Sequence, residues 1–246
     1  GRVANPVLAR AFDTRQQQAG PITTTDGVMT GNGVIRSFTI LSALFVPAAI
    51  FGWTQFDGES FPTWVLGAFV VAIIAVIAGS LKPTWAPFIG PVYAVVEGAI
   101  VGVVSRLYET AYDGLIVQAV LATTVTTFVM AVLYVTRTIE VTARLRSIVT
   151  GATLAIFAFY LISFGLSFFD IGVPLIWDAG LLGIGFSLLV IGIAAFNLLL
   201  DFDLIERGVK GRAPAYMNWY AAFGLMVTIV WLYLEMLRLL AKLRER

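Results

Sequence analysis

Long stretches without a charged residue constrain this chain more than any other feature of its sequence. One such stretch, 83–105, is interrupted only by Glu97, and the others cover residues 37–56, 60–81, 114–136, 147–169, 179–200 and 213–234. A helix rises about 1.5 Å per residue, so roughly 20 apolar residues span the ~30 Å hydrocarbon core of a bilayer. The pattern predicts an all-α, polytopic membrane protein, a bundle of seven transmembrane helices over residues 37–246. Within it we expect the last helix to be central.

The composition supports this class and excludes several functions. Of the 246 residues, 59% are hydrophobic and 13% are charged, whereas soluble domains have about 25% charged residues. The net charge of +1 lacks the basic excess that binding to nucleic acid requires. The chain has no cysteine and no histidine, so thiolate nucleophiles, the Ser/His/Asp triad and the commonest metal ligands are excluded. We expect neither an enzyme nor a cofactor, and any proton sensing falls to Asp or Glu.

The N-terminal segment and the cations predict how the chain is oriented. Residues 1–36 contain QQQ, TTT and GNG and are predicted to form a polar, mostly irregular tail, in which NPVLARAF could form a turn or two on the membrane surface. Its apolar part is too short for a signal peptide. Lys and Arg gather in this tail and in alternate connections, while the opposite connections contain only Arg106. Because cations accumulate on the cytoplasmic side, the N-terminus is predicted to be cytoplasmic.

The end of the chain, LLAKLRER, does not fit this distribution of charge. Seven full crossings place Lys242, Arg244 and Arg246 on the outer side. Either the earlier cations dominate and the basic end is exported, or the last segment dips into the membrane and returns, so that both termini are cytoplasmic. We favour seven crossings.

Glycines recur at spacings that allow membrane helices to pack closely. They are Gly90, Gly98 and Gly102 in the third apolar stretch and Gly180, Gly183 and Gly185 in the sixth. Small residues let helix backbones approach each other in lipid, although glycine is also common in membrane helices generally. The glycines therefore predict either specific helix contacts or ordinary membrane-helix composition.

Four carboxylates are candidates for function. Glu97 lies near the middle of the third stretch, where a charge is costly unless it is paired, hydrated or protonated. It is either a cation or proton site, or a protonated group bonded to a neighbouring helix. Asp201 and Asp203 are two residues apart, about 200° around a helix, so only one of them can face a given cavity. The simpler interpretation places both in a last helical turn, solvated beside Arg207.

Glu235 is followed by Arg238 three residues later and by Lys242 seven residues later, near one helical face. They form either an interfacial ladder of ion pairs or part of a site, and depth decides between the two. A helix that enters the membrane at residue 213 carries Glu235 about 33 Å onward, out of reach of Asp201. If the span begins near Gly224 instead, Glu235 lies about 16 Å deep and can approach the end of the sixth helix.

These acidic motifs resemble those of a known family. The stretches LLLDFDLI and LYLEMLRLL are similar to the YD-type and LYLD-type motifs of the Bax inhibitor-1 family of seven-helix membrane proteins, and YAVVEG is similar to its EG-containing stretch. The resemblance covers roughly residues 35–243. In that family the two motifs supply facing carboxylates, so the resemblance implies that Asp201 and Glu235 form such a pair.

The chain departs from the family pattern at three places. Leu200 stands where Tyr is usual, Glu235 stands where Asp is usual, and the basic cluster expected after the second helix is reduced to Lys82. A single Lys is a weaker latch for a carboxylate than an Arg. The long polar N-terminus and the NWYAAFG stretch suggest a bacterial branch of the family, and hence the bacterial cytoplasmic (inner) membrane.

The resemblance implies a pH-sensitive calcium leak through the bilayer. Two carboxylates that share a site cannot both ionise cheaply, so the pair titrates as a unit. Our hypothesis is that a proton shared by Asp201 and Glu235 ties the sixth and seventh helices together, with Lys82 or Arg238 as a latch or ion-pair partner. Deprotonation would separate the helices and offer oxygen ligands to a transient Ca²⁺.

Three other functions stay open or are disfavoured. A proton-coupled transporter would use Glu97 and the carboxylate pair as a relay, but no inverted repeat supports it. A regulatory protein would bind a membrane protease or another helical partner, with the carboxylates merely structural. An intramembrane hydrolase is disfavoured, because one member of the pair is Glu and no GxGD-like motif is present.

Overall fold

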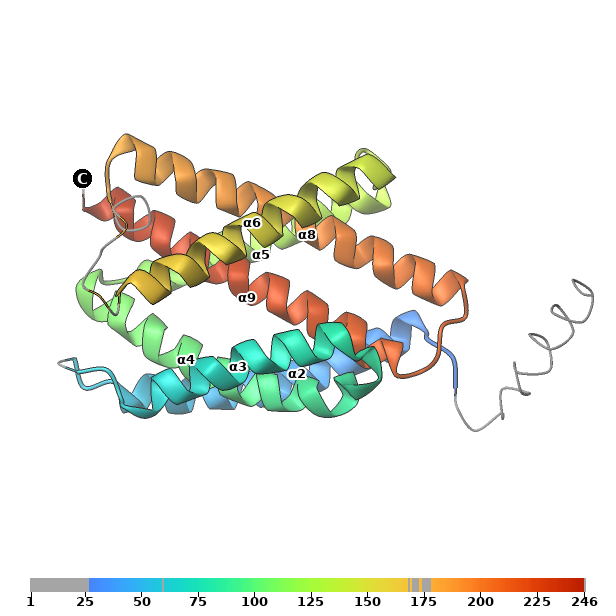
Figure 1. Ribbon diagram of the computed structural model, residues 1–246, viewed down its shortest axis with the longest axis horizontal. Coiled ribbons are helices and arrows are strands. Elements are labelled where there is room, and N and C mark those ends of the chain that lie inside the picture. Colours follow the sequence, from blue (N-terminus) through green and yellow to red (C-terminus); the bar gives the residue numbers. More distant parts are fainter. Residues whose placement is uncertain (1–26, 59, 168, 170–172, 174–177, 246) are drawn as a thin grey trace, which may run out of the picture.

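The computed structural model describes residues 27–58, 60–167, 169, 173 and 178–245. Within this part of the chain, seven helices are long and apolar enough to cross a membrane (Figure 1). They are α2 (Gly31–Gln55), α3 (Trp64–Leu81), α4 (Ala86–Ala111), α5 (Leu115–Val135), α6 (Ala143–Ser167), α8 (Leu181–Lys210) and α9 (Met217–Arg244), with the short helix η1 (Pro83–Trp85) before α4. The predicted all-α, seven-helix bundle is therefore confirmed.

The ends of the helices differ most from the prediction at α2 and α8. α2 begins at Gly31 rather than residue 37, because Thr30 caps it by accepting a hydrogen bond from the Gly33 amide (3.0 Å). Most of the predicted tail, residues 1–26 including NPVLARAF, lies outside the described residues. α8 continues to Lys210, so the prediction that Asp201 and Asp203 lie in a last helical turn is wrong.

Successive long helices run in opposite directions across the bundle (Figure 1). We call the side on which α2 begins the N-side and the side on which α9 ends the C-side. α9 is one continuous helix of 28 residues, about 42 Å long. It therefore crosses the bundle instead of dipping in and returning, and it ends on the side opposite the start of α2.

The last helix is central, as expected. One cluster of buried side chains joins α2, α3, α4 and α9, and a second joins α4, α5, α8 and α9. α9 contributes Phe223, Met226 and Val230 to the first cluster and Leu232 and Leu237 to the second. α9 therefore belongs to both clusters. Every long helix except α6 packs mainly against α9 or against its neighbour α4.

Glycines bring α2 and α4 into close contact. A Cβ atom at Gly98 or Gly102 of α4 would collide with the backbone carbonyls of Phe45 or Ala49 in α2, and one at Gly52 of α2 would collide with α4. The close-packing interpretation therefore holds for these α4 glycines. In α8, by contrast, Gly183 abuts the backbone of the preceding segment and Gly185 has open space around its Cβ position.

Candidate functional site

The last turns of α8 carry ion pairs on the N-side of the bundle. Asp203 Oδ2 accepts a hydrogen bond from Arg146 (2.7 Å) and forms an ion pair with Arg207 (2.8 Å). Glu206 pairs with Arg137 and Lys210. These contacts tie the end of α5 and the start of α6 to α8, so Asp203 is an ion-paired structural residue rather than a merely solvated one.

Glu206 has a third polar partner, Tyr134 of α5, whose hydroxyl donates to its carboxylate. Arg137, which lies just beyond α5, has a pKa raised above its ordinary value, because it donates a hydrogen bond to the Glu206 carboxylate. The pair of Arg137 with Glu206 therefore links the end of α5 to α8.

Asp201 occupies a different environment, two residues before Asp203 on the opposite face of α8. It points at α9 where Gly224 has no side chain: a Cβ there would lie 3.8 Å from Asp201 Oδ1. The Thr228 hydroxyl donates a hydrogen bond to the Gly224 carbonyl oxygen (3.2 Å) and is also the polar group of α9 that interacts with this carboxyl group. Asp201 Oδ2 is buried and has no hydrogen-bond partner among the described residues.

Glu235 lies almost fully buried (1% exposed) on α9. Its Oε1 accepts one hydrogen bond from Tyr160 of α6 and one from Arg238, both 2.7 Å long. Arg238 also donates to the Tyr160 hydroxyl (2.7 Å), and its guanidinium lies 5.1 Å from the centre of the Tyr160 ring. Glu235 Oε2 is buried without a partner among the described residues. Tyr160 and Arg238 therefore hold one carboxylate oxygen of Glu235, and the other oxygen has no partner among the described residues.

The structure does not bring Asp201 and Glu235 into contact. Thr228, the α9 partner of Asp201, precedes Glu235 by seven residues, which is two helical turns or about 10.5 Å along the axis. Glu235 lies about 27 Å from the start of α9 at Met217. Asp201 and Glu235 are nonetheless closer in depth than the 33 Å expected for a last helix that enters the membrane at residue 213. The reason is that Asp201 lies well inside α8 and not at its end. A directly shared proton is therefore absent from this conformation.

The other predicted residues lie apart from both carboxylates. Glu97 of α4 is half-buried one turn from Tyr93, whose ring meets Phe223 of α9 edge-on at 5.2 Å. Lys82 follows α3, with its Nζ 4.5 Å from the centre of the Trp85 ring. Neither of them forms a hydrogen bond or an ion pair with Asp201 or Glu235. Of the two suggested partners, Arg238 alone bonds to Glu235.

Several polar residues at the site were missed in the sequence. Tyr160 is the most important, and Asn197 of α8 donates a hydrogen bond to Thr153 of α6 (2.7 Å). Lys242, by contrast, was predicted to lie near the helical face of Glu235; it is buried (3% exposed) and donates to the Gly183 carbonyl (2.9 Å) and the Ser187 hydroxyl (3.1 Å) of α8. For Asn197 the available signal was a polar amide inside a stretch otherwise suited to lipid, since such groups face the protein interior, whereas a tyrosine gives no comparable signal.

α6 is joined to the bundle by polar links and by ring contacts with Phe69 of α3 and Phe186 of α8. Only Val149 and Ile156 of its 25 residues are buried. Its links lie at three depths: Arg146 to Asp203, Thr153 to Asn197, and Tyr160 to the carboxylate on α9. With so little buried apolar surface, the attachment of α6 depends on these side chains.

The described residues contain no built metal site. No group of three or more His, Cys, Asp or Glu side chains there converges on one point. Ca²⁺ takes six to eight oxygen ligands, and Asp201 and Glu235 lie too far apart in depth to hold one ion together. The two residues predicted as transient calcium ligands, Asp201 and Glu235, therefore lie at separate places along the α8–α9 interface.

Comparison with known proteins agrees with this architecture. The family model described as Bax inhibitor 1 like matches residues 5–245, nearly the whole chain. No match was found among curated proteins or among solved structures. The match includes both acidic motifs and all seven long helices. The chain therefore belongs to the Bax inhibitor 1 like family of membrane proteins.

Proposed function

We propose that this protein is a pH-sensitive calcium leak whose pathway follows the interface of α8, α9 and α6. The observation that carries the proposal is that Asp201 and Glu235, both within membrane-spanning helices, each keep one buried carboxylate oxygen without a hydrogen-bond partner among the described residues. Buried polar atoms are nearly always satisfied, so an unsatisfied oxygen marks a place for a proton, a water or a cation. Such groups inside the membrane are costly and usually functional.

Asp201 serves as the proton-dependent element of this gate. Its described partner is the neutral Thr228, and no ion pair joins it to a cation. A protonated Asp201 leaves the contact between Asp201 and Thr228 uncharged, and the α8–α9 interface closed at this depth. Loss of the proton creates a buried negative charge, which costs several kcal/mol until water or a cation enters. The proposed gate therefore opens as pH rises and uses a proton on Asp201 alone, not one shared with Glu235.

Glu235 provides the second oxygen site, two turns closer to the C-side. Arg238 neutralises it and Tyr160 covers it in this conformation. Arg238 and the buried Lys242 place two cations between Glu235 and the C-side, and they oppose the entry of a divalent cation. Movement of α6 would draw Tyr160 away and expose Glu235 to an incoming ion, which would then compete with Arg238; in this proposal the conformation with Tyr160 bonded to Glu235 is the closed one.

Calcium influx into proteoliposomes, measured as a function of pH, tests the proposal. The wild-type leak is expected to increase with pH, and Asp201→Asn, which keeps this side chain neutral, is expected to hold the leak low at every pH. Glu235→Gln is expected to reduce the flux at high pH because it removes a charged oxygen ligand. Asp113→Asn is the matched control: Asp113 is exposed in the α4–α5 connection, away from the links that hold α6, and this variant should retain the pH response.

Two results would contradict the proposal. A correctly folded wild-type protein that passes no calcium at any pH would remove the channel function. A pH response that persists unchanged in Asp201→Asn would show that the proton acts elsewhere. If saturable exchange of another solute for protons were found instead, the protein would be a transporter.

A further inference from the structure

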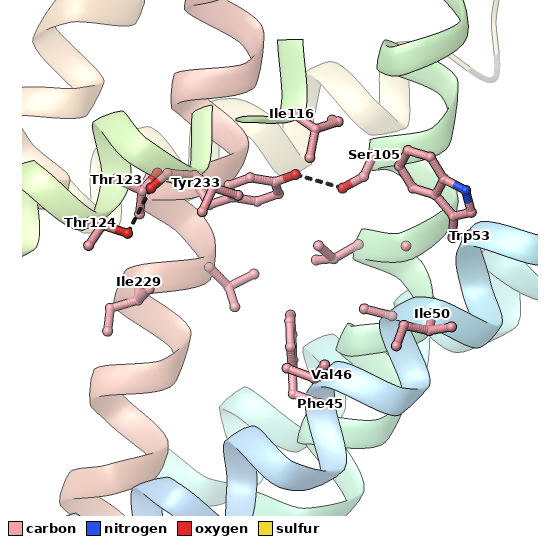
Figure 2. Close-up of a pocket in the computed structure, with 15 residues that line it drawn as sticks. Phe45, Val46, Ile50, Trp53, Ser105, Ile116, Thr123, Thr124, Ile229 and Tyr233 are labelled. Carbon is pink, nitrogen blue, oxygen red and sulfur yellow. Dashed lines mark hydrogen bonds between the residues drawn. The ribbon is translucent and has the colours of Figure 1, made fainter. Parts of the chain in front are cut away.

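A lateral groove lies between α2, α4, α5 and α9, away from the α8–α9 carboxylates (Figure 2). Its volume is about 580 Å³, within the range of about 300–1,000 Å³ of ligand pockets. Its walls are apolar and its rim includes the exposed side chains of Val46, Ile50 and Val120. Because these helices span the membrane, the groove opens toward lipid.

The groove reaches from the C-side interface toward the middle of the bilayer. Trp53 lines it two residues before the end of α2, and Phe45 lines it eight residues earlier, about 12 Å deeper than Trp53. On α5 the lining extends from Ile116 to Thr124. The groove is therefore a slot about half the thickness of the hydrocarbon core, oriented along the direction of an acyl chain.

One end of this slot is polar. The hydroxyls of Ser105 and Tyr233 lie 2.7 Å apart at the end near Trp53 (Figure 2). Two hydroxyl groups have two hydrogens, and their mutual hydrogen bond uses one of them. The second hydrogen is available to an acceptor in the groove, such as the ester carbonyl of a lipid.

The cation Arg106 lies beside the same end of the groove. The guanidinium of Arg106, next to Ser105 on α4, lies 5.1 Å from the centre of the Trp53 ring. No carboxylate among the described residues forms an ion pair with Arg106. Its charge lies near the C-side interface, at the level of lipid headgroups, and Arg is the side chain best suited to bind phosphate.

We propose that this groove binds one phospholipid from the C-side leaflet, with an acyl chain in the slot and the lipid phosphate on Arg106. The slot alone would accept any apolar occupant. At the interfacial end of the slot lie the cation Arg106 and the free hydroxyl hydrogen of the Ser105–Tyr233 pair. These two groups favour a lipid, because its phosphate can bind the cation and its ester can accept the hydrogen. An anionic phospholipid is favoured over a zwitterionic one, because no carboxylate among the described residues forms an ion pair with Arg106.

Native mass spectrometry of the delipidated protein in detergent, titrated with dioleoylphosphatidylglycerol, tests this assignment. The wild type is expected to retain one tightly bound lipid. Val120→Trp fills the slot from α5 and is expected to abolish this binding. Arg106→Gln is expected to weaken it roughly tenfold, since loss of a charge-assisted hydrogen bond corresponds to about 1.4 kcal/mol or more. Val125→Trp is the matched control, because Val125 is exposed on the opposite face of α5.

The outcomes separate the lipid from other occupants. Equal binding by the wild type and Val120→Trp would overturn the assignment of the groove, and equal binding by the wild type and Arg106→Gln would overturn the assignment of the phosphate. If Val120→Trp fails to fold, Arg106→Gln alone still decides the headgroup contact. A dimer that disappears in Val120→Trp, without any lipid effect, would show that the groove holds a helix of a second copy, and would also overturn the proposal.

Discussion

Tyr160 on α6 donates its hydroxyl hydrogen to the buried carboxylate of Glu235 on α9 across 2.7 Å. This bond joins the least buried long helix to the central one. Arg238 donates to both partners, so the three side chains form a closed set of hydrogen bonds within the bundle. Because α6 buries few apolar side chains, the state of Glu235 bears directly on how firmly α6 is held.

Replacing Tyr160 with Phe should loosen α6 while leaving the ion pair between Glu235 and Arg238 in place. The substitution removes one hydrogen bond to a charged group, which corresponds to about 1.5–3 kcal/mol. We expect a lower melting temperature in detergent and a calcium leak that begins at lower pH. Tyr216→Phe is a suitable control, because Tyr216 lies in the α8–α9 connection and not near the α6 contact. A calcium leak with the same pH dependence as the wild type would show that the attachment of α6 does not affect gating.

The hydrogen bond between Asn197 and Thr153 should contribute a small, measurable coupling between α8 and α6. Interhelical hydrogen bonds in membranes contribute about 0.6 kcal/mol on average and reach about 1.7 kcal/mol. A double-mutant cycle with Asn197→Leu and Thr153→Val, followed by unfolding in detergent, measures this energy. A coupling energy of zero would mean that Asn197 is satisfied within α8, where it also donates to the Ile193 carbonyl (2.9 Å).

Side chains introduced at the glycines between α2 and α4 should be strongly destabilising. Gly98→Val and Gly102→Val place atoms against the carbonyls of α2, and overpacking of this kind costs about 1–3 kcal/mol or more. Gly67→Val in α3 is the matched control, since a Cβ there meets nothing within 4 Å. Thermal unfolding of the three variants in detergent checks the prediction, and equal melting temperatures would contradict the close contact.

Two arginines that end helices should respond differently to replacement by glycine. Arg137 after α5 and Arg212 after α8 both adopt left-handed backbone conformations, with φ of 57° and 50°. This conformation costs a residue with a side chain about 1–2 kcal/mol, and glycine avoids that cost. Arg212→Gly should therefore raise the melting temperature. Arg137→Gly should raise it less or lower it, because it also breaks the ion pair with Glu206. A destabilised Arg212→Gly would contradict this account.

The helices themselves were predictable because apolar stretches between charges report directly on bilayer thickness. The limits of α8 were not, because the charged residues from Asp201 to Lys210 continue the helix through ion pairs with α5, α6 and α8 itself. Hydropathy detects where a helix leaves lipid and not where its backbone hydrogen bonding ends.

The candidate site was only partly predictable for a related reason. A carboxylate within an apolar stretch identifies itself by its cost in lipid, so Glu97 was recognisable from its position, whereas Asp201 and Glu235 follow such stretches and were singled out as a pair by the resemblance of their motifs to the family. Their partners were not. Tyr160 lies more than 70 residues from Glu235 in the chain, and an uncharged phenol in an apolar stretch has no distinctive pattern.

The sequence by itself determined that this chain crosses a membrane seven times, which residues carry charge within it, and which family its motifs resemble. It did so because lipid imposes a length and a polarity on each segment independently. Only the tertiary structure decided that Asp201 faces Thr228 while Glu235 faces Arg238 and Tyr160, two turns apart along α9. The depth at which a residue of α8 faces a residue of α9 depends on how the side chains of the two helices pack against each other. It therefore cannot be read from either segment of the sequence alone.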